Sequence, residues 1–279
     1  MFMRHRHLKY LRTEMLPTAF CAGCGCGTIL NLFCHAIDEL KISPDDIISV
    51  TGIGCSSWIP SPYFAGDTMH TTHGRAIAFA TGVKVMKPEK KVVVIAGDGD
   101  LAGIGGNHLI HAARRNIDLT VFLVNNYVYG MTGGQVSPTT PYKINTTTTP
   151  YGNPEHPFKV AELVAAAGGV YVARWTTYHI FHLKKAMKEA LQKTGFSFVE
   201  ICSQCPTSYG RRIGKREGVD LLNDFKTNSV NIKHSSKYSQ EELEEKIIVG
   251  KFAEKSRPEF VESLRQLNKR ILKEQGVKQ

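Results

Sequence analysis

Two apolar runs that each end in a polar motif constrain the fold of this chain more than any other feature of its sequence. Residues 91–96 (KVVVIA) lead into GDGD at 97–100, and residues 119–124 (LTVFLV) lead into NN at 125–126. The stretch between them, 105–116, has a helical pattern. Strand, helix and strand form the parallel crossover unit, which predicts both polar motifs at the same carboxyl edge of a sheet. That edge is where doubly wound sheets bind their ligands.

The same alternation of apolar runs and amphipathic stretches continues on both sides of this unit. Further helices are predicted over 27–40, 74–86, 159–167 and 178–193, and further strands over 47–51, 170–173 and 197–202. This pattern predicts an α/β fold with a doubly wound, mostly parallel sheet. The loop over 130–157 is rich in Thr, Pro and Gly, and its length inside a compact domain indicates a binding loop.

The composition changes beyond residue 217, which predicts a boundary there. Residues 1–217 carry the α/β pattern, whereas 218–279 are rich in Lys, Glu, Ser and Asn. Two helices are predicted in this second part, over 239–249 and 257–274. We expect residues 218–279 to form a charged helical extension that packs on a partner subunit.

The net charge of +10 raises the possibility of a nucleic-acid ligand. The positive residues, however, lie mostly in scattered pairs such as Arg114-Arg115 and Arg211-Arg212, without interleaved aromatic residues. We therefore expect no nucleic acid as a partner. A basic surface also suits an acidic electron carrier or a polyanion such as coenzyme A.

Sequence signals for location favour the cytoplasm. No segment approaches the roughly 18 consecutive apolar residues of a membrane span, so no membrane association is expected. The N-terminal stretch Met1–His7 is basic, but no apolar region or cleavage site of a signal peptide follows it. Seven cysteines, an odd number, favour a reducing compartment and metal or redox roles.

The polar motifs at the two strand ends predict a magnesium site. Asp98 supplies a carboxylate, Asn126 supplies a neutral amide oxygen, and a nearby backbone carbonyl completes a set of oxygen ligands. Such a set suits Mg²⁺ that also binds diphosphate oxygens and water. Gly97 and Gly99 leave room for a phosphate. A helix that starts near Gly103 is expected to point its amide groups at the same place.

The cysteines allow two metal sites. Cys21 and Cys24 form one Cys-x-x-Cys pair, Cys202 and Cys205 form another, and Cys55 follows the predicted strand 47–51. A structural zinc site would use the two pairs. A [4Fe–4S] cluster would use Cys21, Cys24, Cys55 and Cys205, the last of which precedes a proline as many iron–sulfur ligands do. Cys26 and Cys34 are predicted to be packing residues of a helix, and Cys202 is predicted to be a buried residue of a strand. Spacing alone does not decide between the zinc site and the cluster.

The sequence around these motifs resembles a known family. GDGD followed by NN resembles the signature of thiamine-diphosphate enzymes. THGRAIAFATG (72–82), GDGDLAGIGGNHLIHAARRNIDLT (97–120) and NNYVYGMTGGQVSPTTP (125–141) resemble the β subunit of 2-oxoacid:ferredoxin oxidoreductases. The 2-oxoglutarate synthase (KorB-like) branch is the most similar. The resemblance runs from about residue 10 to 212 and more loosely to the end.

This resemblance implies an activity and a set of cofactors. Residues 1–217 would be the domain that binds thiamine diphosphate on its diphosphate side, together with Mg²⁺ and a [4Fe–4S] cluster. The reaction would be the oxidative decarboxylation of a 2-oxoacid, with coenzyme A accepting the acyl group and ferredoxin accepting electrons through the cluster. The resemblance also favours the cluster over zinc.

The resemblance assigns roles to individual residues but no catalytic residue in this chain. Mg²⁺ would be bound by Asp98, Asn126 and the Val128 carbonyl. Gly99, Asp100, Gly130 and Met131 would line the diphosphate and thiazolium, and Ile53, Gly54, Cys55 and Ser56 the pyrimidine side. The cluster ligands would be Cys21, Cys24, Cys55 and Cys205. His73 would face the cofactor, although it also suits a helix cap, and Asp100 also suits a first-turn residue that favours the helix dipole.

The sequence predicts that a second cofactor-binding domain lies on another chain. Thiamine catalysis needs a glutamate at the pyrimidine ring, normally from a second α/β domain, for which the sequence has no room. We therefore expect the chain to be active only with an α partner that carries this domain, in an αβ assembly or a larger one with γ and δ subunits.

The substrate is less constrained than the reaction. Trp58 stands where relatives that handle a dicarboxylic 2-oxoacid often have Lys or Arg, and an indole cannot pair with a distal carboxylate. The flanking sequence favours 2-oxoglutarate, and pyruvate or a branched-chain 2-oxoacid is the alternative. A non-oxidative thiamine-diphosphate decarboxylase or synthase would not need the cysteines. A non-catalytic iron–sulfur or zinc protein would not need the magnesium ligands.

Overall fold

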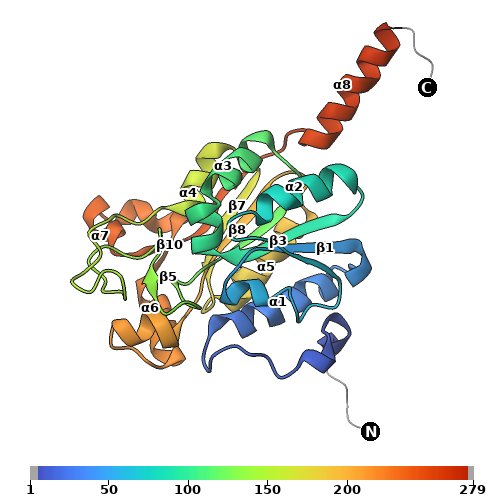
Figure 1. The fold of residues 1–279 in the computed structure, drawn as a ribbon. Helices are drawn as coiled ribbons and strands as arrows, with labels where there is room; N and C mark the ends of the chain where they lie inside the picture. The colour runs from blue at the N-terminus through green and yellow to red at the C-terminus, as the bar shows by residue number, and fades with distance from the viewer. Residues whose placement is uncertain (1–5, 276–279) are drawn as a thin grey trace.

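The computed structural model describes residues 6–275, which form an eight-stranded sheet in the order β2-β1-β3-β4-β8-β7-β10-β9 (Figure 1). The strands β2, β1, β3, β4, β8 and β7 are all parallel to their neighbours in this part of the sheet. Strand β10 is antiparallel to β7, and β9 is parallel to β10. The strands are β1 Ile47–Thr51, β2 Asp67–His70, β3 Lys91–Gly97, β4 Thr120–Asn125, β7 Tyr171–Thr176, β8 Ser197–Cys202, β9 Ser229–Asn231 and β10 Ile247–Glu254. The predicted mostly parallel α/β fold is confirmed.

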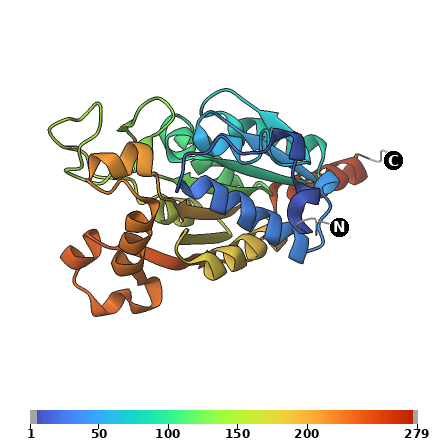
Figure 2. The same ribbon diagram turned by 90° about the horizontal axis from the view of Figure 1, so that it is seen from below.

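Helices cover both faces of the sheet. In Figure 1, α2, α3 and α4 lie above the sheet and α1 and α5 below it; Figure 2 shows α1 (blue) beside α5 (yellow). The bounds are α1 Gly25–Glu39, α2 Ala76–Met86, α3 Gly106–Arg115, α4 Val160–Ala167 and α5 Ile180–Gln192. Because both faces are covered, the central strands β3 and β4 are apolar on both sides, which explains their continuous hydrophobic runs.

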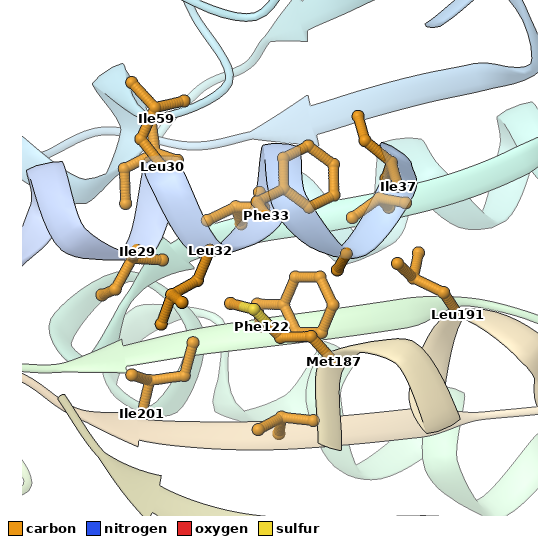
Figure 3. Close-up of a cluster of buried hydrophobic side chains, with 14 of the residues drawn as sticks. Ile29, Leu30, Leu32, Phe33, Ile37, Ile59, Phe122, Met187, Leu191 and Ile201 are labelled. Atoms are coloured by element: carbon orange, nitrogen blue, oxygen red, sulfur yellow. The ribbon is translucent and has the colours of Figure 1, made fainter. Parts of the chain in front are cut away.

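The larger core lies between the sheet and the helices α1 and α5 (Figure 3). Phe122 on β4 is fully buried, and its ring centroid lies 6.1 Å from that of Phe33 on α1. Met187 and Leu191 of α5 belong to the same cluster. Residues 121 and 123, adjacent to Phe122, face the second core beneath α2, α3 and α4. This double packing holds β3 and β4 in place beside each other.

Smaller elements occupy the loops and the C-terminal part. The two-stranded ribbon β5 Val128–Tyr129 and β6 Gln135–Val136 lies within the long loop, and α6 Gly218–Asn228, α7 Gln240–Glu244 and α8 Phe260–Glu274 follow β8. Short 3₁₀ helices span Arg6–Tyr10, Thr13–Met15, Pro44–Asp46, Cys55–Trp58 and Ile232–Lys237, and π-helical turns span Gly99–Ile104 and Pro206–Gly210.

The helix predicted over 239–249 is wrong. Only Gln240–Glu244 is helical, and Ile247–Glu254 forms β10, which pairs with β7 and extends the sheet. The charged residues before it suggested one helix, but Ile247, Ile248 and Val249 are β-branched and pair well in a strand. A partner strand far away in sequence therefore outweighs the local helical pattern.

A second correction concerns the turn after β3. The helical segment begins at Gly99 rather than near Gly103, and it is a π-helical turn that breaks at Gly103 before α3 starts. The segment that follows Asp98 therefore turns directly over the end of the strand. The remaining predicted helices and strands up to residue 202 are present with bounds shifted by a few residues at most.

The C-terminal helix α8 agrees with the prediction over 257–274. It extends away from the rest of the molecule (Figure 1), and Leu264, Leu267 and Ile271 on it are each about 40% exposed. Its packing on a partner subunit stays a prediction. Part of the basic N-terminal stretch considered above, residues 1–5, lies outside the described residues. Within residues 6–275, no helix combines the length and apolarity needed to span a bilayer.

Candidate functional site

Residues from five adjacent strands meet at the carboxyl edge of the sheet. Cys55, His73, Asp98, Asn126 and Cys205 follow β1, β2, β3, β4 and β8, respectively, within a few residues of each strand end. Parallel pairing of these strands puts all five segments on the same side of the molecule. The ligand-binding edge predicted from the crossover unit is therefore also the place where the two cysteine-containing loops lie.

Asp98 is a buried carboxylate with one oxygen fixed in place. Its side chain is 1% exposed, and its Oδ2 accepts hydrogen bonds from the Ser137 hydroxyl (2.6 Å) and the Thr139 hydroxyl (2.5 Å). Burial raises the pKa of Asp98 because it penalises the ionised form, although both hydroxyls act in the opposite direction. A cation near the other oxygen, Oδ1, would offset this cost of burying a charge.

Two oxygens and the Asn126 amide converge on the free side of Asp98. The end of the Asn126 amide that faces this side lies 3.2 Å from Asp98 Oδ1 and 2.7 Å from the Val128 carbonyl oxygen. With the amide nitrogen there, both contacts are hydrogen bonds in the metal-free chain; with the oxygen there, three acceptors face one another. Neighbouring ligands of an octahedral Mg²⁺ lie about 3 Å apart, since Mg–O bonds are about 2.1 Å. Both distances from the Asn126 amide therefore suit neighbouring ligands of a magnesium ion.

Asp100 connects three loops at this edge. Its Oδ1 accepts hydrogen bonds from the backbone N–H of Ile53 (3.2 Å) and of Gly74 (2.8 Å), and it lies 2.5 Å from His73 Nδ1. Its side chain is 1% exposed, and Oδ2 has no hydrogen-bond partner among the described residues. Asp100 therefore positions the loops after β1 and β2, which goes beyond the first-turn dipole role considered above.

His73 is oriented by Asp100 and remains accessible. Because its Nδ1 bonds to Asp100, its Nε2 is the ring nitrogen available for another group. The side chain is about one-third exposed, and its ring stands edge-on to Tyr129 at 6.0 Å between centroids. His73 begins no helix itself, since α2 starts at Ala76. The observed contacts thus favour a role at the site over a helix cap.

Glycines allow the backbone segments of the site to approach one another. A methyl group on Gly99 would lie 2.2 Å from the Tyr129 ring, and one on Gly52 would lie 2.2 Å from Asp100 Oδ2. Gly54 has a φ of 137° and open space at its Cβ position. Around these glycines, Ile53 and Met131 are 44% and 48% exposed. The site thus combines a tight polar base with accessible apolar side chains.

Four thiols lie next to the group formed by Asp98 Oδ1, the Asn126 amide and the Val128 carbonyl, which we call the oxygen cluster. They belong to Cys21, Cys24, Cys55 and Cys205 and are called the thiol cluster. Burial, then the neighbouring thiols Cys205, Cys24 and Cys21, raises the pKa of Cys55 to about 11. Burial also raises the pKa of Cys205, with further contributions from Cys24 and Cys21. Distances agree that these residues lie near one another: Cys55 and Cys205 both lie within 4 Å of a methyl group placed on Gly130, and the Gly25 N–H, next to Cys24, donates to the Gln204 carbonyl (3.0 Å), next to Cys205. Ionising them together is unfavourable without a positively charged group between them.

Backbone amides and a neighbouring thiol hydrogen-bond to two of these sulfurs. The Tyr209 and Ser208 amides donate to Cys205, and hydrogen bonds from Cys26 lower the pKa of Cys24 to about 7. Hydrogen bonds to cysteine sulfur are a usual feature of iron–sulfur sites, where they tune the cluster potential. Two of the four candidate ligands thus receive hydrogen bonds of the kind found at iron–sulfur sites.

Cys202, the alternative zinc ligand, has different surroundings. Its thiol is fully buried, and burial followed by the charge of Glu200 raises its pKa to about 12. Tyr127 donates a hydrogen bond to it. Among the described residues, no three His, Cys, Asp or Glu side chains surround a single ion position. Tetrahedral zinc needs sulfurs only about 3.8 Å apart, whereas each cysteine of a cubane binds a different iron and lies farther from the others.

Gly130 links the two clusters. A methyl group there would lie 3.7 Å from Cys205 Sγ, 3.9 Å from Cys55 Sγ and 3.8 Å from the Asn126 amide nitrogen. The thiol cluster and the oxygen cluster are therefore separated by little more than one backbone segment. The family resemblance implies such an adjacency, because it assigns residues 53–56 to the cofactor and Cys55 among them also to the cluster.

Sequence reasoning missed the residues that support the site. Ser137 and Thr139 orient Asp98, and Thr140 anchors their loop by donating to the Tyr127 carbonyl (2.5 Å). Tyr129 packs on Gly99 and donates to its carbonyl (3.2 Å). The only available signal was the Thr-rich composition of the loop 130–157, which indicated binding but not which hydroxyl bonds to which group.

Comparisons with known proteins agree with a thiamine-diphosphate site at this edge of the sheet. The family described as thiamine pyrophosphate enzyme, C-terminal TPP binding domain, matches residues 52–201. The chain is 53% identical to the 2-oxoglutarate synthase subunit KorB of Methanocaldococcus jannaschii, covering 97% of this chain and 100% of that protein. It is 48% identical to the KorB of Archaeoglobus fulgidus, with 97% of each covered. The chain belongs to the KorB family.

A solved structure supports membership of the KorB family. A chain of the 2-oxoglutarate:ferredoxin oxidoreductase from Magnetococcus marinus, solved with 2-oxoglutarate, coenzyme A and succinyl-CoA bound, superposes with a TM-score of 0.84 at 34% identity. The match covers 96% of this chain and 91% of that chain. The predicted family and its thiamine-diphosphate-binding domain are thus confirmed. Cys21, Cys24 and Cys205 lie outside the range 52–201 that matches the broader thiamine family.

The contact between Gly52 and Asp100 yields a stability prediction. Replacing Gly52 with alanine should push Asp100 off the amides of Ile53 and Gly74, and we expect a loss of about 1–3 kcal/mol in unfolding free energy, as for other overpacked sites. The control is Gly82→Ala, at a helical position with nothing within 4 Å of the added methyl group. It should stabilise the protein by about 0.5–1 kcal/mol. Urea unfolding of both variants measures this, and equal effects would contradict the role of Asp100.

Proposed function

We propose that this chain is the β subunit of a 2-oxoacid:ferredoxin oxidoreductase. The enzyme would convert a 2-oxoacid, coenzyme A and oxidised ferredoxin into acyl-CoA, CO₂ and reduced ferredoxin, with 2-oxoglutarate as the favoured substrate. One observation carries this proposal: a magnesium-type oxygen cluster and a four-thiol cluster lie on either side of Gly130. A non-oxidative thiamine enzyme has no use for the thiols, and a simple iron–sulfur protein has no use for the oxygens.

The oxygen cluster is proposed to hold Mg²⁺ and through it the diphosphate. Asp98 Oδ1, the Asn126 amide oxygen and the Val128 carbonyl would supply three ligands, and diphosphate oxygens and water the others. The hydroxyls of Ser137 and Thr139 would keep the carboxylate in position. This arrangement fixes the diphosphate end of the cofactor against the sheet.

The neighbouring residues are proposed to line the rest of the cofactor. Gly99, Asp100, Gly130 and Met131 would line the diphosphate and thiazolium, and Ile53, Gly54, Cys55 and Ser56 the pyrimidine side, with His73 facing the same space. When bound, thiamine diphosphate supplies the electron sink that allows a 2-oxoacid to lose CO₂. Exposed Ile53 and Met131 would exclude water from this region once the cofactor covers them.

The four thiols are proposed to hold a [4Fe–4S] cluster that conducts electrons away from this site. Cys21 is exposed, whereas Cys24, Cys55 and Cys205 are partly buried. The cluster would therefore have one side toward Gly130 and the cofactor and another toward the surface. This position suits the transfer of single electrons to an external carrier.

The hydrogen bonds of Glu200 support the need for a partner subunit. Glu200 is the one buried glutamate among the described residues, and its oxygens already accept hydrogen bonds from Asn125, Arg174 and the Ala161 amide. It is thus not available for a pyrimidine ring. We propose that the required glutamate comes from an α subunit, and that the distal carboxylate of 2-oxoglutarate is also bound there, because Trp58 offers no positive charge.

The overall proposal is tested with the reconstituted complex. Under anaerobic conditions, the chain together with its α partner should reduce ferredoxin in the presence of 2-oxoglutarate and coenzyme A, and the chain alone should not. Rates with pyruvate and with a branched-chain 2-oxoacid are measured in parallel, because Trp58 cannot pair with the distal carboxylate of 2-oxoglutarate. Turnover by the chain alone, or product formation without an electron acceptor, would contradict the proposal.

The cluster ligands are tested with a pair of serine variants. Cys55→Ser should abolish the visible absorption and reduced-state EPR signal of the anaerobically purified chain, whereas Cys202→Ser should retain about four irons per chain. The second variant is a matched control because serine keeps an acceptor for Tyr127. The zinc alternative makes the opposite prediction. The protein would be colourless, and Cys202→Ser would lose the bound zinc.

The magnesium ligands are tested with Asp98→Asn. We expect Mg²⁺-dependent thiamine-diphosphate binding to weaken by more than about 100-fold, since second-shell changes alone cost about 10–100-fold. Removing a buried charge should not lower the melting temperature of the metal-free chain, because burial disfavours the ionised Asp98. Exposed Asp67→Asn is the control. Calorimetric titration of the complex measures binding, and unchanged affinity in the Asp98 variant would exclude this site.

A further inference from the structure

A short basic loop lies next to the four thiols and has no role in the site described so far. Residues 211–216, with the sequence RRIGKR, connect the turn Pro206–Gly210 to α6. Arg211, Arg212 and Arg216 are exposed, and Lys215 is half-buried. Among the stretches of sequence that flank the candidate cluster ligands, this one has the most positive side chains.

Both ends of this loop are attached to cysteine-containing segments. At its start, the Gly210 N–H donates to the Cys205 carbonyl (2.9 Å), and the Lys215 N–H returns to the Gly210 carbonyl (2.8 Å). At its end, Gly218 packs on the turn between Cys21 and Cys24, where a methyl group on Gly23 would lie 3.3 Å from Gly218 Cα. The loop is thus a compact turn held beside Cys21, Cys24 and Cys205.

The charge of the loop is largely uncompensated. Lys215 pairs with Asp224 at 2.5 Å. For Arg211, Arg212 and Arg216, in contrast, no carboxylate lies within ion-pair distance among residues 6–275. Three exposed guanidinium groups without an ion-pair partner among these residues therefore belong to a loop that packs beside the turn of the exposed Cys21. Such a surface attracts an acidic protein and orients it as it approaches.

We propose that residues 211–216 form the docking surface for an acidic one-electron carrier protein of the ferredoxin type. This inference rests on the proposed function, and it specifies where the carrier binds. Oxidation of one 2-oxoacid to acyl-CoA and CO₂ releases two electrons and one proton. Each docked carrier accepts one electron from the cluster held by the thiols, so two carriers dock in turn and the proton goes to solvent. Docking beside Cys21 and Cys205 keeps each transfer short.

The test compares two Arg-Arg pairs in the assembled enzyme. Arg211→Gln/Arg212→Gln removes two charges of the loop, and Arg114→Gln/Arg115→Gln removes an exposed pair at the end of α3, at the opposite edge of the sheet. Steady-state reduction of an acidic ferredoxin and of methyl viologen is measured for both variants at low and high salt. For the loop variant we expect the KM for ferredoxin to rise about five- to tenfold at low salt, as for the loss of two surface ion pairs.

The readouts separate docking from the chemistry that precedes it. The loop variant should keep its kcat, reduce methyl viologen as the unmodified enzyme does, and lose most of the salt dependence of its KM for ferredoxin. The control pair should leave all of these values unchanged. Equal effects of both pairs on ferredoxin, or failure of the loop variant to assemble with its α partner, would overturn the docking inference. An unmodified complex that reduces neither acceptor would instead overturn the proposed function.

Discussion

The burial of the Asp98 carboxylate is the interaction on which the rest of this site depends. An ionised carboxylate inside a protein is costly unless hydrogen bonds or a cation balance it. Two hydroxyls from the long loop, Ser137 and Thr139, satisfy one oxygen and leave the other facing Asn126 and the Val128 carbonyl. The parallel pairing of β3 with β4 sets this spacing, because it places the ends of the two strands side by side. A cation at this position would offset the cost that the fold imposes.

The second organising feature is the sharing of backbone segments between the two clusters. The loop after β1 contributes Ile53 to the Asp100 network and Cys55 to the thiols, and Gly130 lies between Cys55, Cys205 and Asn126. A side chain at Gly130 would separate the clusters further. Because these segments are shared, the proposed cofactor site and the proposed electron-transfer site fit on one edge of one sheet. The basic loop 211–216, which we propose as the docking surface, is exposed and begins next to Cys205.

Sequence patterns predicted the elements near the site well and those near the C-terminus poorly. The runs before Asp98 and Asn126 are apolar on both faces, which is typical of central parallel strands, and β3 and β4 lie where this pattern indicated. The prediction for residues 247–254 failed because their partner strand, β7, is more than 70 positions away in the sequence. The charged residues that precede them also have a pattern typical of a helix. Asp100 was identified as a site residue, but its bonds to Ile53, His73 and Gly74 depend on contacts between loops that no local pattern reports.

Local chemistry in the sequence was enough to establish the α/β class, the thiamine-diphosphate motif and the family, because each is carried by short runs of residues with fixed spacing. Which cysteines lie together, which hydroxyls hold Asp98, and whether the C-terminal segment joins the sheet were decided by long-range packing. Cys202 illustrates the difference: its spacing from Cys205 suits a metal site, yet its strand buries it beside Tyr127 and Glu200. Side chains separated by a hundred residues meet only when the whole sheet forms, so their distances are a property of the folded chain.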